Sequence, residues 1–390
     1  MLETKDIGLR GITVADTRIC AVDGEKGKLI YRGYDIDELA KYSTFEETVY
    51  LLLYETLPTT KELEIFREAL ASQRQLPVGI VRHLRKRKKS AHPMDVLQSV
   101  IPMLADFDEE SHIKTKGAKI KQSIRIIAKM ATLVAYWDRI RKNLDIINPD
   151  EDLDHAANFL YMLKGETPDE ETARDFDICL ILHAEHSFNA STFAARVVAS
   201  THAHMYACIG AALAALSGEL HGGANTQVMK MLIEINKIEH VEKWIRTKFD
   251  AGEKIMGMGH PVYKTIDPRA SILSTISENL AERTGNLKWF ELSRKIDSVS
   301  REEFKRRKKR EIYPNVDFYS PSVYYVMEID PDLFTSIFAV SRISGWCAHI
   351  IEEKFAEAQP KPALYRPEAD YIGNYCGIEK CKYVPLDMRK

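Results

Sequence analysis

The chain has 390 residues, of which 45% are hydrophobic and 29% are charged. It is long enough to bury a large core, as two domains or as one domain with a subdomain. Its 55 lysines and arginines nearly balance its 57 aspartates and glutamates, so the net charge is -2. This balance argues against a dedicated nucleic-acid-binding or membrane-surface protein.

The cysteines and the first residues bear on the compartment. None of the six cysteines forms a C-x-x-C motif, and these spacings disfavour a zinc–cysteine site. Cys179 and Cys208 lie in helical apolar patterns that are typical of reduced core thiols. Cys376 and Cys381 could pair in an oxidising compartment, although the sequence does not require it. The N-terminal residues contain no apolar segment typical of a secretory signal, and we expect that no stretch reaches the length needed to cross a bilayer, so we expect a cytoplasmic protein.

Turn-forming glycines surround the run Lys28–Arg32, and this pattern predicts a short hairpin near the N-terminus. From Ile36 onward hydrophobic residues recur with a helical period. Ser43 or Thr44 is expected to cap the first clear helix. Period-two strands and internal repeats are almost absent, so the sequence predicts an all-α protein of many medium helices. The predicted helices cover roughly 45–54, 60–70, a run opened by Pro77, 93–104, 114–140, 151–163, 175–187, 190–200, 204–216, 223–236, 239–250, 268–282, 287–308, 321–328 and 331–353.

Two basic runs and one stretch of small residues stand out. Arg82–Lys89 is interpreted as a solvated helix face. Lys305–Arg310 is either a solvated face or a contact to a phosphate-bearing ligand. Small residues recur at helical spacing over 203–215, which allows two helices to approach closely. This stretch is expected either to pack within the chain or to form a helix–helix subunit interface.

The segment His183–Ser191 contains His183 and His186, which would share a face of one helix at their i, i+3 spacing. Zinc-binding helices usually space their ligands H-x-x-x-H, so this spacing differs from a metal helix. For each histidine alone, a packed or capping role is favoured. Asn189 is expected to cap the next helix, which places both histidines at a helix–helix corner that can face a cleft.

The segment Ser217–Asn225 places His221 between one helix and the next. A histidine near a helix N-terminus has a lowered pKa, which favours the neutral imidazole at pH 7. A neutral imidazole that donates a hydrogen bond to a carbonyl can stabilise an enolate-like transition state. Taken alone, the segment would favour a turn histidine without a chemical role.

The segment Ile255–Arg269 combines two glycines, a histidine and a helix start. Gly257 and Gly259 permit unusual backbone angles and close approach of a ligand to the main chain. Pro261 disfavours the α region for His260, so this histidine is expected in a loop. Asp267-Pro268-Arg269 predicts an N-cap, a proline at the first helical position and an arginine beside them. Together these features favour an anion site.

Two further segments carry charged residues in unusual settings. Ser320-Pro321 is expected to start a helix, which would leave Asp317 in the loop just outside it, as a structural carboxylate or as a base that faces a cleft. Arg342 lies inside an apolar helical pattern and therefore needs a buried carboxylate or an anionic ligand. Arg366, before a proline, is ordinary by itself.

At this point the chain resembles the citrate synthase family. The motifs that carry the resemblance are KLIYRGYDI at 28–36, HAEHSFNAST at 183–192, ELHGGAN at 219–225, GMGHPVYKTIDPRA at 257–270 and YPNVDFYS at 313–320. Their order and spacing fit nearly the whole chain, whose length is similar to the shorter bacterial and archaeal-type enzymes. The resemblance implies an almost all-α homodimer, with a large domain over 1–219 and 331–390 and a small domain over 220–330 that close over the substrates.

The resemblance assigns His221, His260 and Asp317 as the catalytic residues. Asp317 would remove a methyl proton from the acyl-CoA, and His221 would donate a hydrogen bond to the thioester oxygen. His260 would polarise the ketone of oxaloacetate. An aspartate alone is too weak a base for the α-proton of a thioester, so base and oxygen donor must act together. The product citryl-CoA would then be hydrolysed in the closed site to citrate and CoA.

The same resemblance assigns the substrate contacts. His186, Arg269 and Arg342 would surround the carboxylates of oxaloacetate, and Arg366 would come from the neighbouring subunit. Arginine suits this role because its planar fork matches a carboxylate. Coenzyme A would contact Lys264 and the loop formed by Met256, Gly257, Met258 and Gly259. The reaction implied needs no metal and no other cofactor.

One position distinguishes two activities within this family. Many citrate synthases of this type have arginine directly after the loop histidine, whereas this chain has Pro261. The GHPVY form is similar to 2-methylcitrate synthases, which use propionyl-CoA, whereas Lys264 and NVDFYS are more similar to the citrate branch. We expect acetyl-CoA as the substrate, with propionyl-CoA, or both, as the alternative. One methylene in a pocket contributes only ~1–3 kcal/mol to discrimination.

A hypothesis from another class remains on the sequence alone. Five histidines in the central third of the chain would serve a helical metal-binding or scaffold protein: His183, His186, His202, His204 and His221. The family resemblance predicts that oxaloacetate-dependent release of free CoA thiol survives exhaustive chelation, whereas a metal site predicts activity that is lost with a chelator and returns with zinc.

Overall fold

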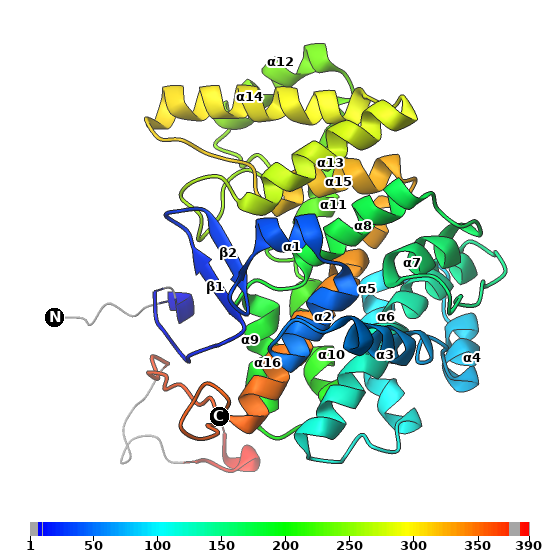
Figure 1. Cartoon of the computed structure of the whole chain (residues 1–390). Helices are drawn as coiled ribbons and strands as arrows, with labels where there is room; N and C mark the ends of the chain where they lie inside the picture. The colour runs from blue at the N-terminus through cyan, green and yellow to red at the C-terminus, as the bar shows by residue number, and fades with distance from the viewer. Residues whose placement is uncertain (1–6, 10, 374–382, 390) are drawn as a thin grey trace.

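A computed structural model describes residues 7–9, 11–373 and 383–389 of the chain (Figure 1). Near the N-terminus three antiparallel strands pair in the order β1 (Cys20–Asp23), β2 (Lys28–Tyr31) and β3 (Tyr34–Asp35). Helices form most of the rest of the described chain. The all-α fold class and the N-terminal hairpin are both confirmed. Cys376 and Cys381, which could pair on the sequence alone, lie outside the described residues.

The helices follow the predicted order closely. Thr44, Asn189 and Asp267 accept backbone N–H groups at three predicted helix starts, because their side chains satisfy donors that the first turn leaves unpaired. The α-helices are α1 (Ile36–Tyr42), α2 (Phe45–Tyr54), α3 (Thr60–Ala71), α4 (Val78–Lys86), α5 (Pro93–Met103), α6 (Lys116–Arg141), α7 (His155–Lys164), α8 (Glu170–His183), α9 (Ala190–Ser200), α10 (Met205–Leu216), α11 (Ala224–Ile235), α12 (Val241–Asp250), α13 (Pro268–Thr284), α14 (Lys288–Lys308), α15 (Val316–Val326) and α16 (Phe334–Phe355). Short 3-10 turns cover Ile7–Leu9, Leu104–Phe107, Ile238–His240, Pro331–Leu333 and Leu386–Met388.

Helix α16 forms the centre of the larger group of helices and packs against α2, α6, α8, α9 and α10 (Figure 1). By length and composition alone, the segment Pro331–Phe355 is apolar enough to cross a membrane, so the expectation that no stretch reaches that length is wrong. The most apolar part of that segment is fully buried inside the protein, which is the behaviour of a core helix.

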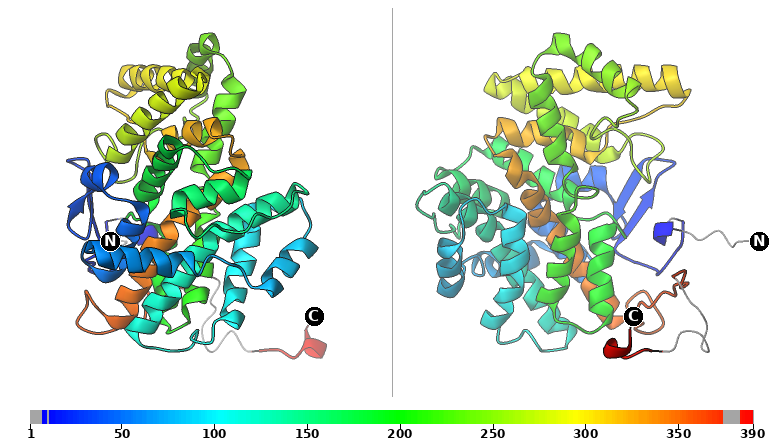
Figure 2. Two further views of the ribbon diagram at one scale, coloured as in Figure 1. Left: turned by 45° about the vertical axis from the view of Figure 1, so that its right-hand side comes forward. Right: turned by 180° about the vertical axis from the view of Figure 1, so that it is seen from behind.

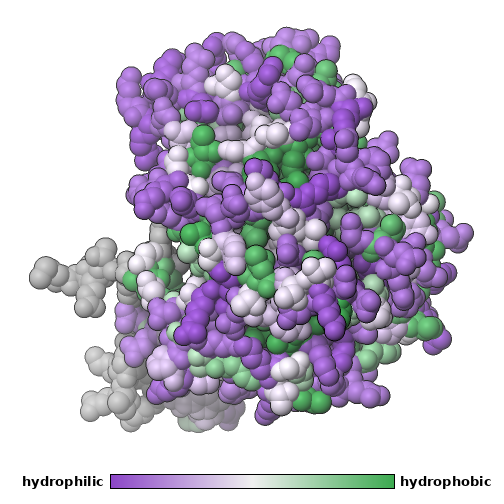
Figure 3. Space-filling view, viewed as in Figure 1, coloured by the Kyte–Doolittle hydropathy of each residue, from purple (hydrophilic) through white to green (hydrophobic). Residues whose placement is uncertain are grey.

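Helices α11 to α15 gather at one end of the molecule, above the remaining helices (Figures 1 and 2). The surface over α12 and α14 is mostly hydrophilic in the view of Figure 3. At the basic end of α14, Glu303 pairs with Arg306 and Arg307, and Lys305 pairs with Glu311. Three of the six basic residues in this run are therefore ion-paired within the chain. The division into domains 1–219 with 331–390 and 220–330 stays a prediction.

The small residues of α10 allow close packing inside the chain. A Cβ atom on Gly210 would lie 3.0 Å from a side-chain atom of Pro102, so α10 and α5 approach closely at this position. Intramolecular packing therefore accounts for one face of the small-residue stretch. The remaining small side chains leave the subunit-interface interpretation open to test.

Candidate active site

A cavity of about 720 Å³ opens where the two groups of helices meet. Segments far apart in the sequence line it: strand β1, the α8–α9 connection, the α10–α11 connection, the loop around residue 260, the start of α15 and helix α16. The predicted site residues among its lining are His186, His221, His260, Arg269, Asp317 and Arg342. The structure thus brings together the catalytic residues and three of the four oxaloacetate contacts assigned by resemblance.

His221 lies in the turn before α11, beside the first turn of α9. Its Nε2 accepts a hydrogen bond from the backbone N–H of Ser191 (3.3 Å) and lies 2.8 Å from the Ser191 Oγ. Because Nε2 acts as an acceptor, the neutral ring carries its proton on Nδ1. Burial, together with the charge of Arg342, lowers the pKa of His221 to about 4. The predicted neutral imidazole is therefore supported, with burial rather than the helix dipole as the main cause.

His260 is fixed in a similar way by its own loop. Its Nδ1 accepts from the backbone N–H groups of Val262 (3.0 Å) and Tyr263 (3.2 Å), so the neutral ring keeps its proton on Nε2. Burial and the nearby charge of Arg269 lower the pKa of His260 to about 4. Each of these two histidines therefore has a single N–H group that is free to donate.

His186 lies against His260, with ring centroids 5.3 Å apart, and its Nε2 is 3.2 Å from the hydroxyl of Tyr263. Burial and the charge of Arg269 lower the pKa of His186 well below its ordinary value. Helix α8 ends at His183, so the prediction that His183 and His186 share a helix face is wrong. His183 is buried, with its Nδ1 2.7 Å from the carbonyl oxygen of Cys179.

Asp317 occupies the first turn of α15, which begins at Val316. The prediction that Ser320 caps this helix and leaves Asp317 outside it is wrong, because Asn315 is the cap and Pro321 lies inside the helix. The Asp317 Oδ1 is buried and has no hydrogen-bond partner among the described residues. Burial raises the pKa of Asp317 to about 6, although Arg269 opposes the shift. A buried carboxylate without partners is a stronger base than an exposed one.

The two cavity arginines differ in their partners. Arg269 forms two hydrogen bonds to the carboxylate of Asp267, through Nε (3.0 Å) and a terminal nitrogen (2.8 Å). Arg342 donates from Nε to the carbonyl oxygen of His183 (2.7 Å), and no carboxylate of the described residues forms an ion pair with it. A buried guanidinium without a carboxylate partner fits the binding of an anion.

The remaining predicted contacts lie outside the cavity lining. Gly257 and Gly259 pair with the segment before α15: the Gly259 N–H donates to Tyr313 O (2.7 Å) and the Asn315 N–H to Gly257 O (2.9 Å). Met258 forms a β-bridge with Pro314. Lys264 is exposed and pairs with Glu25. Met256 is half-buried in the same loop, and Arg366 is exposed after α16, away from the cavity of its own chain.

Sequence patterns did not single out several residues that hold this site. Ser191 contacts His221 and also accepts from the Trp346 indole N–H (3.1 Å), while Tyr263 contacts His186. Asn315 caps α15 and donates to the Gly259 carbonyl oxygen (2.8 Å). Ser191, Tyr263 and Asn315 are polar side chains inside the quoted motifs. Their roles follow from their contacts with residues that are distant in the sequence.

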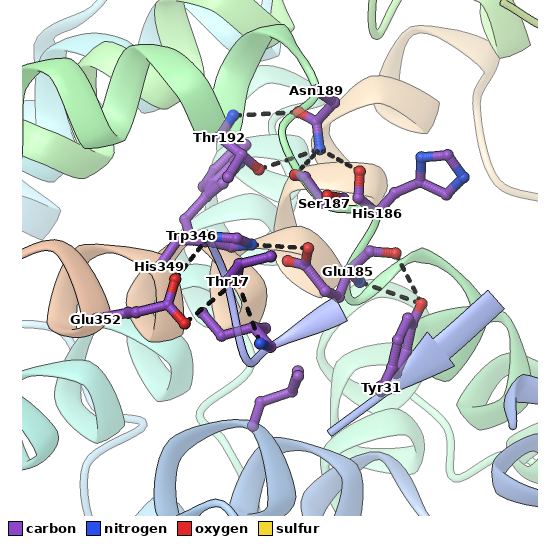
Figure 4. Close-up of polar contacts among 12 residues, drawn as sticks. Thr17, Tyr31, Glu185, His186, Ser187, Asn189, Thr192, Trp346, His349 and Glu352 are labelled. Atoms are coloured by element: carbon purple, nitrogen blue, oxygen red, sulfur yellow. Dashed lines mark hydrogen bonds and ion pairs between the residues drawn. The ribbon is translucent and has the colours of Figure 1, made fainter. Parts of the chain in front are cut away.

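A buried polar network connects helix α16 with the α8–α9 connection (Figure 4). The His349 Nε2 lies 2.9 Å from Glu185, and its Nδ1 lies 3.0 Å from Arg196. Arg196 also pairs with Glu352 (2.7 Å) and Glu353 (2.7 Å). Glu185 directly precedes His186, so the network fixes the loop that carries this cavity-lining histidine.

The arrangement argues against the metal-binding alternative. His202 and His204 line a different cavity from His186 and His221, and His183 bonds to a backbone carbonyl. Within the described ranges, no three His, Cys, Asp or Glu side chains are grouped as metal ligands would be. Cys20, Cys179, Cys208 and Cys347 are free and buried.

Comparison with known proteins gives a consistent result over the whole chain. The family model described as "Citrate synthase, C-terminal domain" matches residues 8–368. Citrate synthase 2 of Bacillus subtilis is 44% identical over 383 residues, and citrate synthase of Haloferax volcanii is 41% identical over 389 residues; each alignment covers 98% of both chains. A 2-methylcitrate synthase of Shewanella oneidensis is 36% identical over 383 residues, covering 98% of this chain and 97% of that protein.

Solved structures agree with this result. Citrate synthase from Pyrobaculum aerophilum superposes with a TM-score of 0.90 at 39% identity, covering 98% of this chain and 95% of that one. The citrate synthase of Thermoplasma acidophilum, in a ternary complex with carboxymethyl coenzyme A and oxaloacetate, has a TM-score of 0.90 at 32% identity and covers 98% of both chains. The chain belongs to the citrate synthase family.

Proposed function

We propose that the protein is an acyltransferase that condenses acetyl-CoA with oxaloacetate and water, releasing citrate and CoA. One observation carries this proposal. A carboxylate with a raised pKa, two histidines that each keep one free N–H, and two buried arginines line the same cavity. A base, two oxygen donors and anion-binding groups are what an enolisation followed by addition to a keto dianion requires.

The first step is the removal of a methyl proton from acetyl-CoA. Asp317 takes the proton, and the Nδ1–H of His221 donates to the thioester oxygen as it gains negative charge. The pKa of about 6 makes Asp317 a stronger base than an ordinary aspartate, yet leaves it ionised at pH 7. The pKa of His221, about 4, keeps its ring neutral in the same range.

The second step joins the two substrates. The enol carbon attacks the keto carbon of oxaloacetate while the Nε2–H of His260 donates to the keto oxygen. His186, Arg269 and Arg342 hold the two carboxylates. Arg342 suits this role because its guanidinium is buried without an ion-pair partner among the described residues. Water then adds to the thioester of citryl-CoA, and the CoA thiol leaves as citrate forms.

Part of the site is proposed to come from a second copy of the chain. Arg366 lies outside the cavity of its own chain, so its assigned contact to oxaloacetate requires a homodimer. Lys264 and the 256–259 loop are proposed to contact coenzyme A. The substrate analogues named for the Thermoplasma acidophilum relative support small-molecule substrates of this kind. We further propose that the reaction needs no metal or other cofactor, and that the protein is cytoplasmic.

The alternative function, a 2-methylcitrate synthase, differs in the acyl group, because it uses propionyl-CoA. Pro261 and Val262 both line the cavity, together with the aromatic ring of Phe338. The relatives include citrate synthases at higher identity and a 2-methylcitrate synthase at lower identity, which favours acetyl-CoA. A side-by-side measurement of kcat/KM with oxaloacetate should favour acetyl-CoA over propionyl-CoA. A preference for propionyl-CoA would assign the chain to the 2-methylcitrate branch.

A further inference from the structure

A second, strongly basic cavity lies apart from the active site. It has a volume of about 210 Å³ and is formed by the turn before α6, the α9–α10 connection and the C-terminal end of α16. Its lining includes three lysines, Lys114, Lys119 and Lys354, and three histidines, His112, His202 and His204. No acidic side chain is part of that lining.

The lysines of this cavity are cationic groups that no carboxylate within residues 7–9, 11–373 and 383–389 pairs with. Lys119 is only 4% exposed, and its Nζ donates to Gln122 Oε1 (2.9 Å) and Ser111 O (3.3 Å). Lys354 donates to Ala203 O. In the part of the chain that the structure describes, no carboxylate forms an ion pair with either lysine. Burial lowers the pKa of both, and repulsion from neighbouring lysines lowers it further.

Two other buried cations of the described chain, both arginines, are matched with carboxylates. Arg196 pairs with Glu352 and Glu353, and Arg269 pairs with Asp267. Asp108, whose charge acts on Lys119, is engaged elsewhere, because it accepts from Arg125 (2.9 Å) and Tyr206 (2.6 Å). An unpaired cluster of cations at a cavity is costly unless an anion joins it.

The histidines add donors to the same cavity. The Nδ1 of His204 accepts from the Ala207 N–H (3.2 Å), so its neutral ring keeps the proton on Nε2. His112 lies against His204, with ring centroids 5.9 Å apart. Asp106 contributes to the field at His204 but does not line the cavity.

We propose that this cavity binds a compact oxyanion with at least two negative charges, namely phosphate or pyrophosphate, either free or as the phosphoryl end of a metabolite. The volume is below the ~300 Å³ typical of drug-sized ligands, which favours a small ion over a whole nucleotide. Lysine binds phosphate as a point charge, and several lysines with imidazole donors match the tetrahedral oxygens. The cavity is distinct from the catalytic one, because none of its lining residues lines the latter.

Isothermal titration of inorganic pyrophosphate into the oxaloacetate-saturated enzyme tests the proposal. Lys119→Met and Lys354→Met should each weaken binding by roughly tenfold or more, since each removes a charge-assisted contact. Lys114→Met provides an exposed variant that does not disturb the core. Lys129→Met is the matched control: Lys129 lies on the same helix α6 and donates to Gln73 O (2.8 Å), but lines a different cavity. It should bind pyrophosphate as the wild type does.

A sugar monophosphate titrated in parallel distinguishes the two sources of the oxyanion. If Lys119→Met weakens the binding of both probes equally, the site recognises only the phosphoryl group. If Lys119→Met weakens the binding of pyrophosphate alone, the site is one for the free ion. All four lysine variants should keep the wild-type kcat for CoA release. Absence of binding at millimolar pyrophosphate, or equal affinity in the wild type and in the Lys114, Lys119 and Lys354 variants, would overturn the proposal.

Discussion

At the scale of single residues, the hydrogen-bond partners of His221 and His260 determine which ring nitrogen of each histidine carries the proton. Ser191 occupies the Nε2 of His221 and leaves Nδ1–H free, whereas backbone N–H groups occupy the Nδ1 of His260 and leave Nε2–H free. Both rings are therefore neutral donors at pH 7. Asp317, the proposed base, is different, because its carboxylate is buried within the field of Arg269 and one of its oxygens has no hydrogen-bond partner among the described residues.

The pH dependence of turnover follows from these pKa values. Asp317 must be ionised to accept a proton, so kcat/KM should rise as pH increases through about 6. The histidines, with pKa values of about 4, are already neutral there and should add no further inflection near neutrality. The profile is measured with saturating oxaloacetate and limiting acetyl-CoA. If kcat/KM instead fell with rising pH across this range, a protonated group would be required for turnover, and Asp317 would not be the base.

At the scale of elements, Gly345 shows why α16 and the α8–α9 connection lie so close. A Cβ atom at this position would overlap the Glu185 carboxylate and the carbonyl oxygen of Ala184. Gly345→Ala should therefore destabilise the protein by about 1–3 kcal/mol and raise the KM for oxaloacetate, because Glu185 directly precedes His186. The matched control is Gly117→Ala in α6, where no atom lies within 4 Å of the added methyl.

Thermal unfolding of the two alanine variants gives the comparison. Gly117→Ala should leave the melting temperature unchanged or raise it, since alanine in a helix reduces the entropy of the unfolded chain. Gly345→Ala should lower it. Equal melting temperatures for both variants would mean that the contact with Glu185 relaxes without cost, and that this packing does not hold the loop.

The elements also show what the sequence could and could not predict. Helical period and local caps determine most helices, and Asn189 and Asp267 are caps as expected. The start of α15 was mispredicted because Asn315 and Asp267 supply acceptors to its first N–H groups, and Asp267 comes from another segment. Likewise, the burial of Asp317 depends on contacts that no local pattern contains. The motif YPNVDFYS indicates Asp317 as a candidate site residue, whereas the fold buries its carboxylate and raises its pKa.

At the scale of the whole molecule, the buried network around α16 connects the segment before β1 and the segment after α16 to the candidate site. The Thr17 hydroxyl and the Arg18 N–H donate to Glu352, while the Tyr365 hydroxyl donates to Glu353. Tyr365 directly precedes Arg366, so the segment that carries this arginine is tied to the same helix as Arg342. The position of Arg366 outside its own cavity is what makes a two-chain active site testable.

Subunit complementation distinguishes a site shared between chains from a site within one chain. Asp317→Asn and Arg366→Leu should each be inactive as homodimers. In a mixed dimer, one site combines the intact Asp317 of one chain with the intact Arg366 of the other. Mixing equal amounts after dissociation and reassembly should restore about a quarter of the wild-type activity. No recovery, with mixed dimers shown to have formed, would place Arg366 in the site of its own chain, whereas full activity of the Arg366→Leu homodimer alone would place it outside any site.

The central claim is that Asp317 performs enolisation without a metal, and CoA release tests it most directly. Free CoA thiol is measured with acetyl-CoA and oxaloacetate after exhaustive chelation, for the wild type and for Asp317→Asn, with oxaloacetate binding measured as the control for folding. We predict that the chelated wild type keeps its full oxaloacetate-dependent rate. The variant should lose at least ~100-fold in kcat while still binding oxaloacetate. Turnover of the variant within about tenfold of the wild type, or wild-type activity that disappears with chelator and returns with zinc, would contradict the account.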